Sequence, residues 1–130
     1  MSREHLDVVR RMLDAFESED WGMAIQLLDP EIEWDPTEGG KYHGLDGVVS
    51  HLTERYEPWD EHRVEVEEIT EMDDRVLAVL HITARGERSG MQIDQRFFHV
   101  YDVRDGRITR MREFVTRDEA LAGAAEGRLE

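Results

Sequence analysis

The stretch HVYDVRDGRITRMREFV, residues 99–115, contains the strongest turn signal in the chain. Its Asp105-Gly106 pair lies between two segments of β character, and such a dipeptide suits the tight turn of a β-hairpin. Working outward from this turn, alternation of apolar and polar residues predicts four consecutive strands, at residues 62–70, 75–85, 91–103 and 107–115. The second half of the chain is therefore expected to be a sheet.

Two local signals refine this half. The alternation of Val64 and Val66 breaks at Glu68-Ile69, which predicts a β-bulge in the first of these strands. Thr116, followed by Glu119 three residues later, forms a capping box and predicts a short C-terminal helix over residues 118–125.

The first half of the chain has helical spacing. Apolar residues recur at three- and four-residue steps from Leu6 to Phe16, and a second short helix is expected from Asp20, as its N-cap, to Leu28. Asp29-Pro30 is expected to end that helix, because proline lacks an amide donor. A short strand over 31–36 and a third helix over 45–56 complete the order.

This order predicts one α+β domain over residues 1–130, with helices on one face of a curved antiparallel sheet. Residues 1–4 and 124–130 are expected to be frayed. One strand, 75–85, is apolar on both faces near its start, so we expect a partner on the outer face of the sheet and hence a homodimer.

Composition excludes several classes of partner and chemistry. Sixteen basic residues against thirty-one acidic ones give a net charge of −15, which argues against nucleic acid or an anionic membrane as partner. The absence of cysteine excludes disulfides, thiolate metal sites and cysteine nucleophiles. Without an HxxxH pair, a phosphate loop or a dinucleotide fingerprint, we expect no metal and no cofactor. The five-residue apolar run at 76–80 is too short for a membrane span, so we expect a cytoplasmic protein.

Three segments resemble the SnoaL-like branch of the nuclear-transport-factor-2-like superfamily. They are VVRRMLDAFESEDWGMAIQLLDPEIEWDP (8–36), GLDGV (44–48) and HVYDVRDGRITRMREFVTRDEAL (99–121). The resemblance implies a cone in which three helices and a bent sheet enclose an apolar cavity that is open at one end. The superfamily includes ketosteroid isomerases, polyketide cyclases, limonene-type epoxide hydrolases and proteins that bind without catalysis, so the fold leaves the function open.

Transfer of catalytic residues from the resemblance is partial. The string EWDP is similar to the ketosteroid isomerase segment that supplies the catalytic base, which assigns that role to Asp35. The two oxyanion donors of that isomerase fall on Met12 and Phe98, which cannot donate. Arg112-Glu113-Phe114 resembles the arginine–acid pair of the epoxide hydrolases, but the other positions of that triad, within residues 80–83, lack an acid and an arginine.

Alternation suggests which ionisable groups face the cavity. Met111 and Glu113 share the more apolar face of the last strand, which would turn Glu113 inward. Arg96, on the face of Phe98, could counter the charge of Asp35 or Glu113, although covering a sheet edge is the more ordinary role for an arginine. The resemblance matches His51 to a cavity-lining position and makes it the leading histidine for acid–base work, whereas His81 and His99 are expected to face the other side of the sheet.

The expected catalytic set is therefore Asp35 as base, assisted by Glu113, His51 and Arg96. The residues expected to line the substrate cavity or its mouth are Met12, Phe16, Trp34, Tyr42, His43, Leu52, Trp59, His62, Leu80, Phe98 and Met111. These side chains indicate a small hydrophobic substrate, with or without a ring, and cofactor-free isomerase, cyclase, dehydratase or epoxide-opening chemistry. Two alternatives stay open: a binding protein for a hydrophobic ligand, and a dimerisation domain with a vestigial cavity.

We predict that the protein has no useful steroid Δ-isomerase activity. Loss of one oxyanion-hole donor typically lowers the rate by about 10²–10³, and Met12 and Phe98 replace both donors. Turnover of a standard enone steroid, followed by absorbance, would show that the alignment or the mechanism is wrong.

Overall fold

The computed structural model describes residues 2–37, 40–56, 59–72, 75–86 and 90–125. The helices in this part of the chain are α1 (Ser2–Glu17), α2 (Trp21–Gln26), α3 (Leu45–Tyr56) and α4 (Arg117–Ala125). The strands are β1 (Leu28–Asp35), β2 (Tyr42–His43), β3 (Glu61–Met72), β4 (Arg75–Arg85), β5 (Gln92–Arg104) and β6 (Arg107–Phe114). Among the described residues, no helix has both the length and the apolar character needed to cross a membrane.

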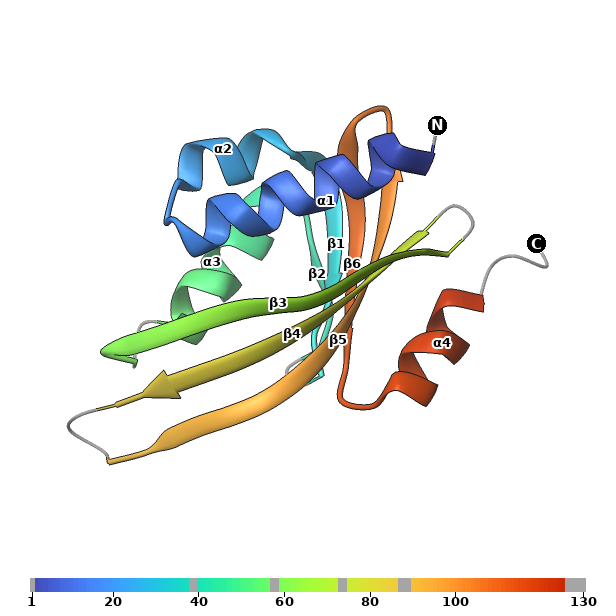
Figure 1. The fold of residues 1–130 in the computed structure, drawn as a ribbon. Helices are drawn as coiled ribbons and strands as arrows, with labels where there is room; N and C mark the ends of the chain where they lie inside the picture. Colours follow the sequence, from blue (N-terminus) through green and yellow to red (C-terminus); the bar gives the residue numbers. More distant parts are fainter. Residues whose placement is uncertain (1, 38–39, 57–58, 73–74, 87–89, 126–130) are drawn as a thin grey trace.

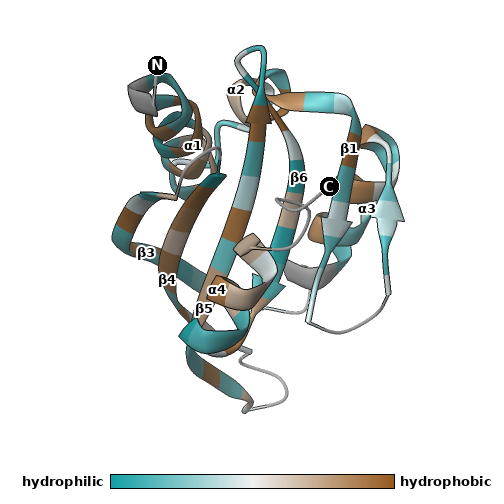
Figure 2. Cartoon of the chain, turned by 90° about the vertical axis from the view of Figure 1, so that its right-hand side faces the viewer, coloured by the Kyte–Doolittle hydropathy of each residue, from teal (hydrophilic) through white to brown (hydrophobic). Residues whose placement is uncertain are grey.

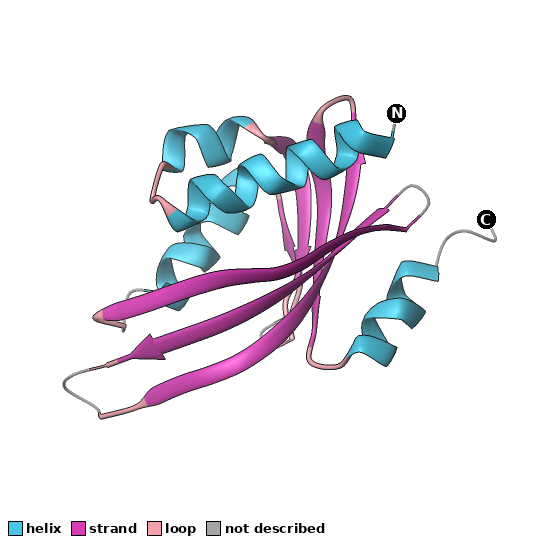
Figure 3. Cartoon of the chain, viewed as in Figure 1, coloured by secondary structure: helices cyan, strands magenta, loops and turns pink. Residues whose placement is uncertain are grey.

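The strands form one curled sheet in the order β2-β1-β6-β5-β4-β3. Neighbouring strands are antiparallel except β1 and β6, which run parallel. Helices α1, α2 and α3 lie on one side of the sheet and α4 on the other (Figures 1 and 3). The predicted α+β architecture, with three helices from the first half and a short C-terminal helix, is confirmed. Two parts of the prediction are wrong: α4 packs on the face opposite the other helices, and the β1–β6 pair is parallel instead of antiparallel.

The second helix is shorter than predicted. It begins at the expected cap, since the Met23 amide donates to Asp20 Oδ1 at 3.2 Å, but it ends at Gln26. A contact with a distant strand ends the helix. The Ile108 amide donates to the Leu27 carbonyl oxygen at 2.8 Å, so the chain pairs with β6 at this point. As a result, β1 already begins at Leu28. Pro30 therefore lies within a strand, in a stretch of irregular register where proline is tolerated.

Other local predictions are confirmed. In β3, Val66 pairs with Leu80 and Glu68 with Val79, so Glu67 is the extra residue of a bulge. In the capping box, the Glu119 amide donates to Thr116 Oγ1 at 3.2 Å. The termini differ from expectation: α1 already begins at Ser2, Ala124 is buried, and residues 126–130 lie outside the described chain.

The β5–β6 hairpin contains an irregularity that sequence alternation did not show. Arg104 pairs with Arg107 and Val103 with Ile108, but Asp102 pairs with Arg110, so Thr109 is an extra residue on β6. Its hydroxyl donates to the Asp102 carbonyl oxygen at 3.2 Å. Beyond this point the pairing is shifted by one residue, which exchanges the side chains that face each other across the hairpin.

The main core lies between the sheet and helices α1 and α3. Its fully buried members include Val9, Met12, Trp34, Val76 and Ile108. Their strands share this face because alternate residues of a pleated strand point the same way. We call it the inner face.

The other face, which we call the outer face, is covered in part by α4 (Figure 2). Leu77 and Val100 pack there with Ala120 and Ala124 of α4. The homodimer prediction rested on an uncovered apolar face, and α4 covers the region around Leu77 instead. Dimerisation stays a prediction.

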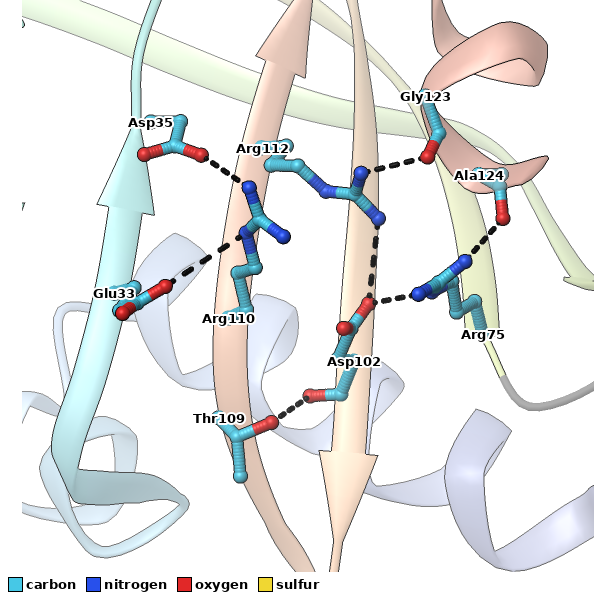
Figure 4. Close-up of polar contacts among 9 residues, drawn as sticks. All are labelled: Glu33, Asp35, Arg75, Asp102, Thr109, Arg110, Arg112, Gly123 and Ala124. Atoms are coloured by element: carbon cyan, nitrogen blue, oxygen red, sulfur yellow. Dashed lines mark hydrogen bonds and ion pairs between the residues drawn. The ribbon is translucent and has the colours of Figure 1, made fainter. Parts of the chain in front are cut away.

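An ion-pair network fastens α4 to the sheet (Figure 4). Arg112 Nη1 donates to the Gly123 carbonyl oxygen at 2.6 Å, and Arg75 donates to the Ala124 carbonyl oxygen. Asp102 joins the two arginines, with Oδ1 at 3.0 Å from Arg75 Nε and 3.5 Å from Arg112 Nη2. These cations sit at the helix C-terminus, where unpaired carbonyls favour positive charge.

Two helical glycines should respond oppositely to substitution by alanine. A Cβ at Gly123 would lie 2.4 Å from Phe114 Cζ, whereas a Cβ at Gly47 would meet no atom within 4 Å. We expect Gly123→Ala to destabilise the protein by about 1–3 kcal/mol through overpacking. Gly47→Ala should be neutral or stabilising by up to about 1 kcal/mol.

Urea unfolding of both variants measures this difference. Equal stability of the two variants would contradict the close packing of α4 on Phe114.

Candidate functional site

A small cavity, which we call the inner chamber, lies between the inner face and the helices. Its volume is about 50 Å³. It is lined by Met12, Leu13, Phe16, Trp21, Trp34, Leu52, His62, Val64, Leu80, His99, Tyr101 and Met111. Most of these side chains are apolar, as expected for a site that binds a hydrophobic molecule.

A wider, open hollow lies beside it, and the residues of β5 and β6 that line it belong to the inner face. We call it the outer basin because it is open to solvent, not because it lies on the outer face. It has a volume of about 840 Å³. Its lining consists of Pro36, Thr37, Tyr42, His51, Glu54, Ile93, Gln95, Phe97, Glu113 and Val115. The basin is more polar than the chamber, and its lining includes the ionisable side chains of His51, Glu54 and Glu113.

The chamber and the basin meet at a buried polar chain of three side chains. Glu113 Oε2 lies 2.9 Å from His99 Nε2, and His99 Nδ1 lies 2.7 Å from the Tyr101 hydroxyl. The side chains of His99 and Glu113 are 11% and 1% exposed. Glu113 Oε1 also accepts from Thr37, from the amide at 3.4 Å and the hydroxyl at 3.3 Å.

The hydrogen bonds favour one arrangement of protons. With Glu113 ionised, its oxygens only accept, so His99 donates through Nε2–H. In a neutral imidazole Nδ1 then accepts from the Tyr101 hydroxyl. The result is a row of hydrogen bonds with one direction: the Tyr101 hydroxyl donates to His99, and His99 donates to the Glu113 carboxylate.

The position of His99 corrects the sequence prediction, which turned it to the other side of the sheet. Residues pair across the hairpin as His99 with Glu113 and Phe98 with Phe114. Without the extra residue Thr109, the turn would have placed Phe98 opposite Glu113 instead. The prediction that Glu113 and Met111 point inward is confirmed.

Aromatic side chains surround the polar chain. The Trp34 ring centre lies 5.7 Å from that of His99 and 6.4 Å from that of His51. Tyr42 stacks on His51 at 4.1 Å. Trp34 is 1% exposed, and its Nε1–H has no hydrogen-bond acceptor among the described residues. A buried donor without an acceptor is unfavourable by about 1–3 kcal/mol, so an occupant with an acceptor oxygen would stabilise this site.

Asp35 does not point into the chamber, although its predicted role required it. Its neighbour Trp34 occupies the inner face, so Asp35 points outward, where Oδ2 accepts from Arg110 Nη2 at 2.9 Å (Figure 4). Burial acts to lower the pKa of Arg110, but the hydrogen bond and charge of Asp35 outweigh it and raise that pKa. Asp35 is thus part of an outer-face ion pair.

Arg96 and Phe98 also lie on the outer face, away from the expected site. Arg96 Nε donates to Glu67 at 2.6 Å, and this hydrogen bond holds the pKa of the Glu67 carboxyl below its ordinary value. Phe98 packs beside α4, with the Arg117 guanidinium 5.5 Å from its ring centre. Alternation separated the two faces of β5 correctly but did not reveal which one is inside, because both carry large apolar residues.

Most of the other predicted lining residues are where the cavity requires them. Those in the chamber are Met12, Phe16, Trp34, Leu52, His62, Leu80 and Met111, and those in the basin include Tyr42 and His51. His43 is exposed and pairs with Glu31 at 3.1 Å. Trp59, half-buried before β3, lies outside both described linings.

Comparison with known proteins identifies the family. Residues 9–111 match the family of the SnoaL-like domain. An uncharacterized protein of Mycobacterium tuberculosis is 34% identical over 115 residues, which cover 84% of this chain and 86% of that protein. An uncharacterized protein of Mycobacterium bovis has the same identity to this chain, 34% over 115 residues, and the same coverage.

Solved structures share the fold. TerC, co-crystallised with polyporic acid, aligns with a TM-score of 0.77 at 22% identity, covering 95% of this chain and 99% of TerC. A putative SnoaL-like polyketide cyclase from Jannaschia sp. aligns with a TM-score of 0.78 at 18% identity, covering 96% of this chain and 93% of the other.

The buried His99–Glu113 pair should show strong coupling in a double-mutant cycle. His99→Phe leaves a buried carboxylate without its main partner, and we expect a loss of about 3–5 kcal/mol in the free energy of unfolding. Adding Glu113→Leu should recover much of that loss. Urea unfolding measures all three variants.

The exposed His81–Asp94 pair provides the control, and His81→Phe should change stability by less than about 1 kcal/mol. Additive effects of His99→Phe and Glu113→Leu would show that the two side chains do not interact as described.

Proposed function

We propose that this chain, which belongs to the SnoaL-like family, is a pocket enzyme that performs cofactor-free acid–base chemistry on a small, largely apolar, cyclic molecule. The family assignment allows either catalysis or binding. Among proteins of similar fold, one is called a putative polyketide cyclase and another was crystallised with polyporic acid.

The observation that carries the proposal is the buried Glu113–His99–Tyr101 chain between the two hollows. Glu113 lines the basin and pairs with His99, which lines the chamber, so its carboxylate lies within reach of a molecule bound in the basin. The outer-face ion pairs of Arg75, Arg110 and Arg112, by contrast, join these arginines to Asp35 and Asp102 and have a structural role.

In the proposed mechanism, Glu113 accepts a proton from the substrate in the outer basin. His99 Nε2–H and Thr37 keep the carboxylate in one orientation through their hydrogen bonds. Orientation matters because a general base must lie within hydrogen-bond reach of the proton that it removes.

Two aromatic groups complete the proposed site. His51, stacked on Tyr42 in the basin lining, donates its own ring proton to another atom of the substrate. Glu113 then releases the proton that it accepted to solvent in the open basin, from which His51 takes up a proton again, so the cycle has no net gain or loss of protons. The Trp34 Nε1–H is the proposed donor to a substrate oxygen on which negative charge develops. Proton transfer within a ring, cyclisation and dehydration all share this sequence of base, acid and oxyanion donor.

The same hollows would serve a cytoplasmic protein that binds a hydrophobic ligand without turnover. This second candidate would also have to use the basin, because the chamber, at about 50 Å³, holds little more than one or two waters. Exchange of substrate protons distinguishes the two candidates.

The test is deuterium exchange next to the carbonyl of cyclohexanone, 4-methylcyclohexanone and 1-tetralone in D₂O, followed by NMR. We expect the protein to accelerate exchange above buffer and Glu113→Gln to lower the protein-dependent rate by about 10²–10⁴, the usual contribution of a general base. Asp35→Asn should retain the rate, since Asp35 lies on the outer face.

A rate that falls in Asp35→Asn but not in Glu113→Gln would restore the assignment made from sequence and overturn this one. Binding of these ketones without any acceleration of exchange would establish the binding protein instead.

A further inference from the structure

The inner chamber is too small to hold a ligand by itself. Ligand pockets usually measure about 300–1,000 Å³, and the chamber measures about 50 Å³. A space of this size has room for about two methylene groups but not for a ring, since a cavity that binds benzene measures about 150 Å³. A ligand that enters the chamber from Glu113 must therefore be thin there and must continue into a neighbouring space.

A groove between the helices provides such a space. It has a volume of about 260 Å³. It is lined by Phe16, Trp21, Ala24, Ile25, Leu28, Val49, Leu52 and Thr53. Thr53 is the polar residue in this described lining, and no charged side chain belongs to it. We call this space the helix groove.

The helix groove and the inner chamber are adjacent and are separated by side chains that line both. Phe16, Trp21 and Leu52 line both. Phe16 and Trp21 meet edge to face with ring centres 5.4 Å apart, and they form the partition between the two spaces. Trp21 is 46% exposed on the six-residue helix α2, so a rotation of its side chain opens the partition without unfolding any element.

The other neighbouring hollow is chemically unsuited to an apolar chain. A space of about 360 Å³ at the ends of β3, β4 and β5 is lined partly by Glu61, Arg63, Arg85 and Asp94. Burial of a methylene chain against these charges would remove water from them without compensation.

We propose that the helix groove binds an unbranched, uncharged alkyl chain of the ligand, whose ring lies in the outer basin at Glu113. This inference rests on the proposed function for the position of the ring. The groove has room for about eight groups the size of a water molecule, which sets a chain of roughly four to eight carbons. The net charge of −15 disfavours a chain that ends in a carboxylate.

The test measures dissociation constants of 4-methyl-, 4-butyl- and 4-hexylcyclohexanone by isothermal titration calorimetry. Each methylene that enters the groove should tighten binding roughly three- to fourfold, as expected for buried CH₂ groups. Calorimetry needs no turnover, so the result is independent of whether the ketones exchange their protons.

Two substitutions on α2 form a matched pair. Ile25 and Met23 are 36% and 37% exposed, but Ile25 lines the groove and Met23 does not belong to its described lining. Ile25→Glu should abolish the gain from butyl to hexyl and leave 4-methylcyclohexanone unaffected. Met23→Glu should bind the whole series like the unmodified protein. Val49→Trp, which fills the groove from α3, should act like Ile25→Glu and guards against a folding defect in α2.

Three outcomes would overturn the inference, and a fourth would support it while rejecting the catalysis. Affinity that does not depend on chain length, with 4-methylcyclohexanone still bound and exchanging, would reject the groove and leave the proposed function intact. A chain-length effect that survives both Ile25→Glu and Val49→Trp would place the chain elsewhere. Light scattering that shows a homodimer dissociated by Met23→Glu and Ile25→Glu alike would make this face an interface between copies. A chain-length effect lost in Ile25→Glu, without proton exchange, would support the groove and reject the catalysis.

Discussion

The extra residue Thr109 determines which side chains meet inside the protein. By shifting the β5–β6 register one residue, it places Glu113 opposite His99 and turns Arg110 and Arg112 outward. The unshifted register would direct both guanidinium groups into an apolar chamber and leave the carboxylate on the outer face. Burying two unpaired cations is so unfavourable that this alternative cannot compete. The polar chain in the site and the ion pairs outside it therefore have one common cause.

This register also separates two tasks between adjacent residues. Arg112 points to the outer face and holds the end of α4, while Glu113 points to the inner face and binds His99. In sequence the two look like one arginine–acid pair, as in the epoxide hydrolases. Because successive residues of a strand face opposite sides, they belong to different networks. The strand thus both anchors α4 and presents a carboxylate to the basin.

The arrangement of the basin, the chamber and the helix groove also depends on strand pairing. The basin, the Glu113–His99 pair, the chamber and the helix groove are adjacent, and polarity falls along that order. The groove lies beside the short helix α2, which the chain leaves at Leu27 to join β6. The pairing that shortens α2 also sets β1 beside β6 and brings Trp34 next to His99.

The sequence by itself determined the order of the elements, the β3 bulge, the capping box and the inward direction of Glu113, because spacing and caps depend on local chemistry. It also identified most of the chamber lining. It did not determine the placement of Asp35, Arg96, Phe98 and His99. Both faces of β5 are apolar, so alternation yields two equivalent sets of residues. Only the tertiary structure decided between them, through the unpaired Thr109 and the packing of α4 on Phe98, since register and helix docking depend on residues far apart in the chain.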